Sequence, residues 1–127
     1  MLLYLGYLNP NPSGLPQYCS KQTALIKDIH TLSTEHLEHR FTIDELSKKY
    51  LINTSSLKEV FKGVYGLPIA TYMKEYRIRK SMELLRQTDD SIAEIAAKVG
   101  YESQGKFTKA FKDITKTTPT AFRKSFH

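Results

Sequence analysis

The chain lacks most of what disulfide-linked, metal-bound or membrane-spanning proteins need. Its 127 residues contain a single cysteine, Cys19, which excludes an intramolecular disulfide framework and any zinc site built from several thiolates. No run of 18 apolar residues occurs, so the sequence predicts no transmembrane helix and no membrane partner. The six glycines are scattered and form no phosphate-binding loop. The expected location is therefore the cytoplasm.

Residues that suggest catalysis or metal binding stand alone in the sequence. His36 and His39 are only two candidate ligands, whereas zinc needs three or four. Cys19 has a single cation nearby in sequence, Lys21, which does not make the cationic surround that would activate a thiol. Asp89 and Asp90 precede a predicted helix, where their carboxylates interact favourably with the helix dipole. We expect no catalytic residue, metal or cofactor, and the chain is not predicted to be an enzyme.

The positive charge of the chain is concentrated in its second half. Residues 1–57 hold five Lys or Arg and five Asp or Glu, whereas residues 58–127 hold fourteen and eight, giving the net charge of +6. A basic surface favours a polyanion such as nucleic acid or an anionic membrane. A solvated basic face without a partner is the alternative that charge alone leaves open.

No stretch alternates with the period of a β-strand, and only helical patterns follow residue 18. Helix signals predict seven helices, at about residues 20–38, 42–49, 54–65, 68–86, 91–99, 103–114 and 118–126. The predicted core includes Leu46, Leu57, Phe61, Tyr76, Ile95, Phe107, Phe111, Ile114 and Phe122. Tyr72 and Tyr76 are interpreted as core of the fourth helix rather than as a base-stacking platform. The apolar residues 1–8 lack a basic lead, so residues 1–18 are expected to be a tail rather than a signal peptide.

The same pattern of a capped short helix, a turn, a second helix and a proline-led helix occurs twice. Thr42–Leu46 matches Ser91–Ile95 at an offset of 49, and Phe61 matches Phe111 at an offset of 50. Two copies are too few for a solenoid, but two helix-turn-helix modules fit a basic chain. The first helix of such a module has about seven residues, the turn three or four, and the second helix about eleven. The alternative to a helix-turn-helix module is an αα-hairpin whose polar face is only exposed to solvent.

Residues 92–124 resemble the C-terminal signature of AraC/XylS-type transcription regulators. The features that carry the resemblance are Ile95-Ala96, Val99-Gly100-Tyr101, Ser103, Phe107, Phe111-Lys112, Pro119 and Phe122-Arg123. Residues 41–85 resemble the family's first motif and linker helix, so the match covers about residues 20–124. The resemblance implies an all-α, homeodomain-like fold of seven helices, with two helix-turn-helix lobes joined by a long central linker helix. It also implies a sequence-specific DNA-binding transcription regulator that inserts two recognition helices into successive major grooves.

The outward faces of the two recognition helices supply the candidate DNA contacts. The resemblance implies base contacts by Ser55, Lys58, Glu59, Gln104, Lys106, Thr108 and Lys109. Phosphate contacts are expected from Ser56, Lys62, Ser103 and Lys112. Gly105 stands where family members often carry a polar side chain. Glu59 could accept from cytosine N4, act as a repulsive filter, or pair with Lys58 or Lys62.

The expected organisation is an N-terminal tail or remnant (1–18), a first lobe (19–67), a linker helix (68–87) and a second lobe (88–127). Most family members carry an effector-binding or dimerisation domain ahead of this module, so the chain is either a stand-alone regulator or a piece of a longer one. We expect a monomer on double-stranded DNA, associated with the nucleoid when bound, with RNA polymerase as a further candidate partner. The alternative is a basic module for protein interaction or non-specific DNA binding.

Overall fold

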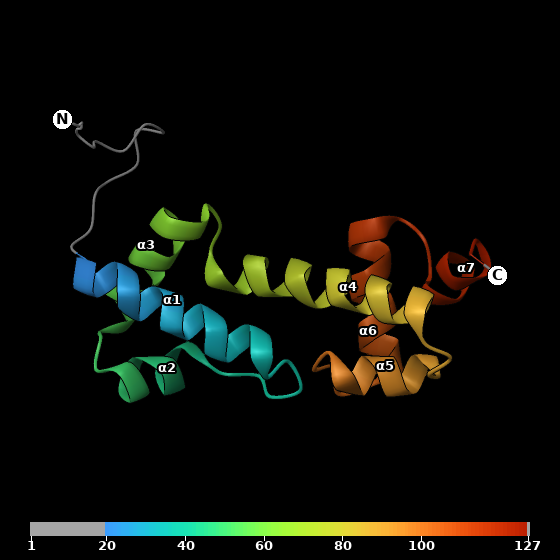
Figure 1. The fold of residues 1–127 in the computed structure, drawn as a ribbon, viewed down its shortest axis with the longest axis horizontal. Helices are drawn as coiled ribbons and strands as arrows, with labels where there is room; N and C mark the ends of the chain where they lie inside the picture. Colours follow the sequence, from blue (N-terminus) through green and yellow to red (C-terminus); the bar gives the residue numbers. More distant parts are fainter. Residues whose placement is uncertain (1–19, 127) are drawn as a thin grey trace. The chain divides into compact units, whose positions relative to one another are not determined.

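The computed structural model describes residues 20–126, and within them every regular element is an α-helix (Figure 1). Seven helices follow one another: α1 (Ser20–Glu35), α2 (Ile43–Tyr50), α3 (Thr54–Tyr65), α4 (Ile69–Gln87), α5 (Ile92–Lys98), α6 (Gln104–Thr115) and α7 (Pro119–Lys124). This confirms the predicted all-α class with seven helices. The expectations for residues 1–18 lie outside the described part of the chain.

Polar residues begin several helices where the sequence predicted them. Ser91 and Glu94 form a complete capping box at α5, each side chain accepting the other residue's backbone N–H, at 3.1 and 2.9 Å. The side chains of Asn53, Ser103 and Thr118 accept in the same way at the start of α3, α6 and α7. Each cap satisfies a backbone donor that has no partner inside its helix, which is why these starts are readable locally.

Among residues 20–126, four adopt the left-handed backbone conformation, and they fall at two equivalent places in the repeat. Gly66 and Lys116 are the C-caps of α3 and α6, with φ of 85° and 66°. Leu51 and Gly100 lie in the turns before these helices, with φ of 53° and 89°. Each copy therefore places a glycine at one of its two left-handed positions and a larger residue at the other.

The described chain divides into two compact units. The first contains residues 20–30 and Ile43–Ile69, and the second contains Thr31–Thr42 with residues 70–126. In the first unit α2 packs against α3, and the most deeply buried side chains are Ile26, Ile29, Leu46, Leu57, Val60 and Phe61. The His30 ring stacks on Tyr65 with centroids 4.5 Å apart, and burial lowers the pKa of His30.

In the second unit α6 packs against both α5 and α7. Phe107 and Phe111 are fully buried, and their rings continue in an edge-to-face series to Phe122. The guanidinium of Arg123 in α7 donates to the Leu85 and Thr88 carbonyls at 3.2 Å, which ties the C-terminal helix to the end of α4. The other fully buried side chains here include Ile78, Leu85, Ile95 and Val99.

The structure corrects several expected details. Ile114, predicted to point inward, is exposed, because it lies in the last turn of α6, beyond the buried stripe of Phe107, Ala110 and Phe111. Tyr76 and Phe122, predicted to be core, are only partly buried. The first helix ends at Glu35 rather than near residue 38, and the turn before α6 has five residues, Val99 to Ser103, rather than three or four. No helix in residues 20–126 is long and apolar enough to cross a bilayer.

Candidate nucleic-acid interface

Helix α3 presents polar and charged side chains on the face opposite its buried stripe. Leu57, Val60 and Phe61 are buried, and their helical spacing turns the intervening residues outward. Of the predicted contact residues, the structure exposes Ser55, Lys58, Glu59 and Lys62. Ser56 is partly buried, and its backbone N–H donates to the Asn53 side chain at 2.8 Å.

Helix α6 has the same construction with a more basic outer face. Phe107, Ala110 and Phe111 form its buried stripe. Ser103, Gln104, Gly105, Lys106, Lys109 and Lys112 are exposed, and Thr108 is partly buried. The Ser103 hydroxyl caps the helix by accepting the Lys106 backbone N–H at 3.2 Å, which leaves its own O–H free to donate.

The two helices differ in charge at equivalent positions. With Phe61 aligned on Phe111, Lys62 falls on Lys112, whereas the acid Glu59 falls on the cation Lys109. Both members of each pair are exposed, so the difference lies on the outer faces. The outer face of α3 is therefore of mixed charge, whereas the outer face of α6 is basic.

Lys106 is engaged in an ion pair that sequence reasoning missed. Its Nζ lies 2.5 Å from Oε1 of Glu102, four residues earlier, and both side chains are largely exposed. This hydrogen bond lowers the pKa of the Glu102 carboxyl. Exposed pairs of this kind contribute little to stability, so Lys106 can exchange its carboxylate for another acceptor at small cost.

The turn before α6 is held by two arginines from outside the second helix-turn-helix. Arg77 of α4 is buried and donates to the Leu37 and Val99 carbonyls, the latter at 2.9 Å. Arg40, exposed in the segment between α1 and α2, donates through Nε to the Gly100 carbonyl at 2.5 Å. Burial and the nearby Arg40 charge lower the pKa of Arg77 to about 10, which leaves its guanidinium cationic at neutral pH. The sequence showed a glycine in this turn but no sign of which side chains would reach it.

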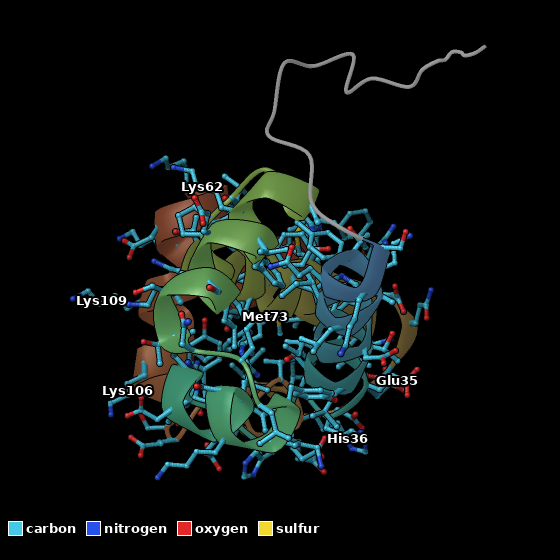
Figure 2. All side chains as sticks on the ribbon, turned by 90° about the vertical axis from the view of Figure 1, so that its left-hand side faces the viewer. Glu35, His36, Lys62, Met73, Lys106 and Lys109 are labelled. Carbon is cyan, nitrogen blue, oxygen red and sulfur yellow. The ribbon has the colours of Figure 1, made fainter. Side chains whose placement is uncertain are left out.

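The basic face of α6 lies on one side of the second unit. Lys106 and Lys109 project on that side, while Glu35 and His36 lie on the other, with Met73 between them (Figure 2). His36 Nδ1 lies 3.8 Å from Oε2 of Glu38, and both side chains are exposed. Within residues 20–126 no three His, Cys, Asp or Glu side chains gather closely enough to hold a metal ion.

Two short helices, each followed by a turn and a longer helix with a polar outer face, define a protein with two helix-turn-helix units. The profile of the family described as "Helix-turn-helix domain" matches residues 46–125. The chain is 33% identical to the TetD protein of transposon Tn10 from Escherichia coli, over 81% of this chain and 75% of TetD. It is 33% identical to the transcriptional regulator Rob of Salmonella typhimurium over 82% of this chain.

A solved structure of the C-terminal domain of the response regulator YesN from Fusobacterium nucleatum is also similar. It is 32% identical, with a TM-score of 0.72, over 82% of this chain and 99% of that domain. The chain belongs to the AraC/XylS-type family of helix-turn-helix regulators, as the sequence motifs indicated. It spans 36% of the length of Rob, so the match to Rob is to one part of that protein.

Proposed function

We propose that the chain binds double-stranded DNA in a sequence-specific manner and regulates transcription, with α3 and α6 as its recognition helices. The observation that carries this proposal is the repeated unit itself: two capped 12-residue helices, each with a buried stripe and a polar outer face. A helix of this kind fits the major groove of B-DNA, where base edges present hydrogen-bond donors and acceptors.

The two outer faces supply groups suited to different parts of the duplex. Base contacts are proposed for Ser55, Lys58, Glu59, Gln104, Lys106, Thr108 and Lys109, and phosphate contacts for Ser56, Lys62, Ser103 and Lys112. Lys62 and Lys112 occupy equivalent positions in the last turns of α3 and α6. A long, flexible cationic side chain at that place suits a phosphate, because a phosphate demands charge rather than exact geometry.

We further propose that one copy of the chain binds an asymmetric site. The organisation that serves this is a first lobe at 19–67, a linker helix at 68–87 and a second lobe at 88–127. Because the two outer faces differ at Glu59 and Lys109, two lobes read two different half-sites. Footprinting together with light scattering of the complex tests this proposal, and a palindromic site occupied by a protein dimer would contradict it.

Selection of bound duplexes from random DNA at two salt concentrations is the experiment that tests the proposed function. One preferred sequence and a steep loss of affinity with salt are expected. Lys112→Ala should weaken all sequences alike and reduce the slope of log affinity against log salt by about one. Lys109→Ala should instead relax preference at particular base pairs, by about 1–3 kcal/mol. Equal, sequence-blind losses from both variants would leave only non-specific attraction.

The remaining parts of the proposal concern the cell. A chain that binds genomic DNA would act in the cytoplasm on the nucleoid, without a catalytic step of its own. If it activates transcription, RNA polymerase is a partner, and transcription reconstituted with purified polymerase on the selected site tests this. A protein-interaction module without DNA preference would show neither the salt dependence nor the selected sequence.

A further inference from the structure

Three consecutive residues in the turn before α6 are each held by an arginine from elsewhere in the second unit. The Val99 carbonyl accepts from Arg77, the Gly100 carbonyl accepts from Arg40, and the Tyr101 ring lies under the Arg40 guanidinium at 4.6 Å from its centroid. These contacts join residues 22, 60 and 61 positions apart in the chain. The turn therefore has little freedom to move independently of α4 and of residues 36–41, which lie between α1 and α2 (the 36–41 segment).

The fit around the middle residue of this turn is close. Gly100 has φ of 89°, and a Cβ at this position would collide with the Leu37 carbonyl and the Arg77 guanidinium. The equivalent residue of the first unit, Leu51, is 93% exposed. The described residues of the first unit, 20–30 and 43–69, contain no arginine, so this unit has no arginine of its own to hold its turn.

The turn leads directly into the recognition helix. Tyr101 is followed by Glu102, by the cap Ser103 and then by the first residue of α6. The Tyr101 ring also contacts Phe107 in the buried stripe of α6, with centroids 5.7 Å apart. A displacement of the turn would therefore tilt or shift the outer face of α6.

We propose that Arg40 and Arg77 are positioning residues for α6, which set the orientation in which its outer face meets the bases without themselves reading the sequence. This inference rests on the proposed DNA-binding function. Hydrogen bonds to base edges weaken steeply when distances and angles change, whereas flexible lysines follow a phosphate over a wider range. Loosening the turn should therefore reduce sequence preference more than overall attraction to DNA.

The decisive variant is Arg40→Lys, because it keeps the charge. A lysine ammonium has neither a plane to stack on Tyr101 nor an Nε–H, so lysine cannot reproduce both contacts at once, while the net charge is unchanged. Arg86→Lys is the matched control, since Arg86 is an exposed arginine in α4 that also lies over a ring, Phe126, at 6.0 Å. Arg77→Lys tests the buried arginine of the two in the same way. Its DNA binding is compared with the parent's once a circular dichroism melt shows that the variant is folded.

Affinity is measured for the selected duplex and for a shuffled duplex of the same composition, at several salt concentrations, alongside thermal melting. For Arg40→Lys we expect the preference for the selected duplex to fall about tenfold, equivalent to about 1.4 kcal/mol. The salt slope and the affinity for shuffled DNA should stay near those of the parent, and Arg86→Lys should retain full preference.

Other results would overturn the inference in distinguishable ways. If Arg40→Lys keeps the full preference, the turn does not need this arginine. If Arg40→Lys matches the parent while Arg40→Gln weakens both duplexes equally and lowers the salt slope, Arg40 is a phosphate contact instead. If the parent and Arg86→Lys show no preference for any duplex, the proposed function itself fails, and this inference with it.

Discussion

Gly66 and Gly100 offer a comparison in which backbone conformation is matched and surroundings differ. Both have a left-handed backbone, with φ of 85° and 89°. A Cβ at Gly66 would meet nothing within 4 Å, whereas a Cβ at Gly100 would strike the Leu37 carbonyl and the Arg77 guanidinium. Replacing each glycine by alanine therefore separates the cost of the backbone from the cost of the contact.

The expected magnitudes follow from these surroundings. Gly66→Ala should lose only the left-handed penalty for an L-residue, about 1–2 kcal/mol of the free energy of unfolding. Gly100→Ala pays the same penalty and also displaces Arg77 from two buried carbonyls, each costing about 1–3 kcal/mol when left unpaired. The second variant should thus lose at least about 2 kcal/mol more than the first, and melt at least about 8 °C lower.

Urea and thermal denaturation followed by far-ultraviolet circular dichroism measure both variants against the parent. Because the chain has two compact units, the second unit should also be followed separately, through hydrogen exchange of the α5 and α6 amides. Equal losses from Gly66→Ala and Gly100→Ala would show that Arg77 moves aside freely. That result would refute the argument that the turn and the arginine fit closely.

Three further substitutions test other parts of the structure. Phe111→Ala removes a fully buried ring that contacts Phe107 and Phe122, and should lose about 3–5 kcal/mol in denaturation and with it DNA binding; a melt like the parent's would contradict this placement. Lys116→Gly removes the left-handed strain at the C-cap of α6 and should raise the free energy of unfolding in urea by about 1 kcal/mol, because the exposed hydrogen bond from Lys116 Nζ to the Asp113 carbonyl contributes less than this strain; an unchanged or lower value would contradict the argument. Burial lowers the pKa of His30, so the folded chain binds its proton less readily than the unfolded chain, and stability should fall as pH drops below 6.5. His30→Phe should reduce that fall in urea titrations at several pH values, and an unchanged pH dependence would assign it to other groups.

The local features of this protein were readable from the sequence because each depends on residues within one turn of helix. Helices were predicted to begin at about residues 54, 91, 103 and 118, and in the structure Asn53, Ser91, Ser103 and Thr118 each cap a helix by accepting a backbone N–H three residues later. The outer face of α6 followed from the spacing of Phe107 and Phe111, since the helical period alone turns Lys106 and Lys109 away from them. The repeat and the family motifs followed for the same reason, because they are patterns along the chain.

What depended on distant residues required the tertiary structure. Helical spacing puts Ile114 on the same face as Phe107 and Phe111, and only the packed structure shows it to be exposed. The Leu37 carbonyl, two residues beyond the end of α1, accepts from Arg77 rather than from a helical N–H. No spacing in the sequence pairs Arg40 with Gly100, because the two are 60 residues apart. From the sequence alone, Arg40 and Arg77 could each equally well be a solvent-exposed surface residue. Periodicity determines which way a side chain points along its own helix. Which carbonyl a long guanidinium finally reaches is decided only when α4, the 36–41 segment and the turn before α6 pack together and exclude water from the polar groups between them.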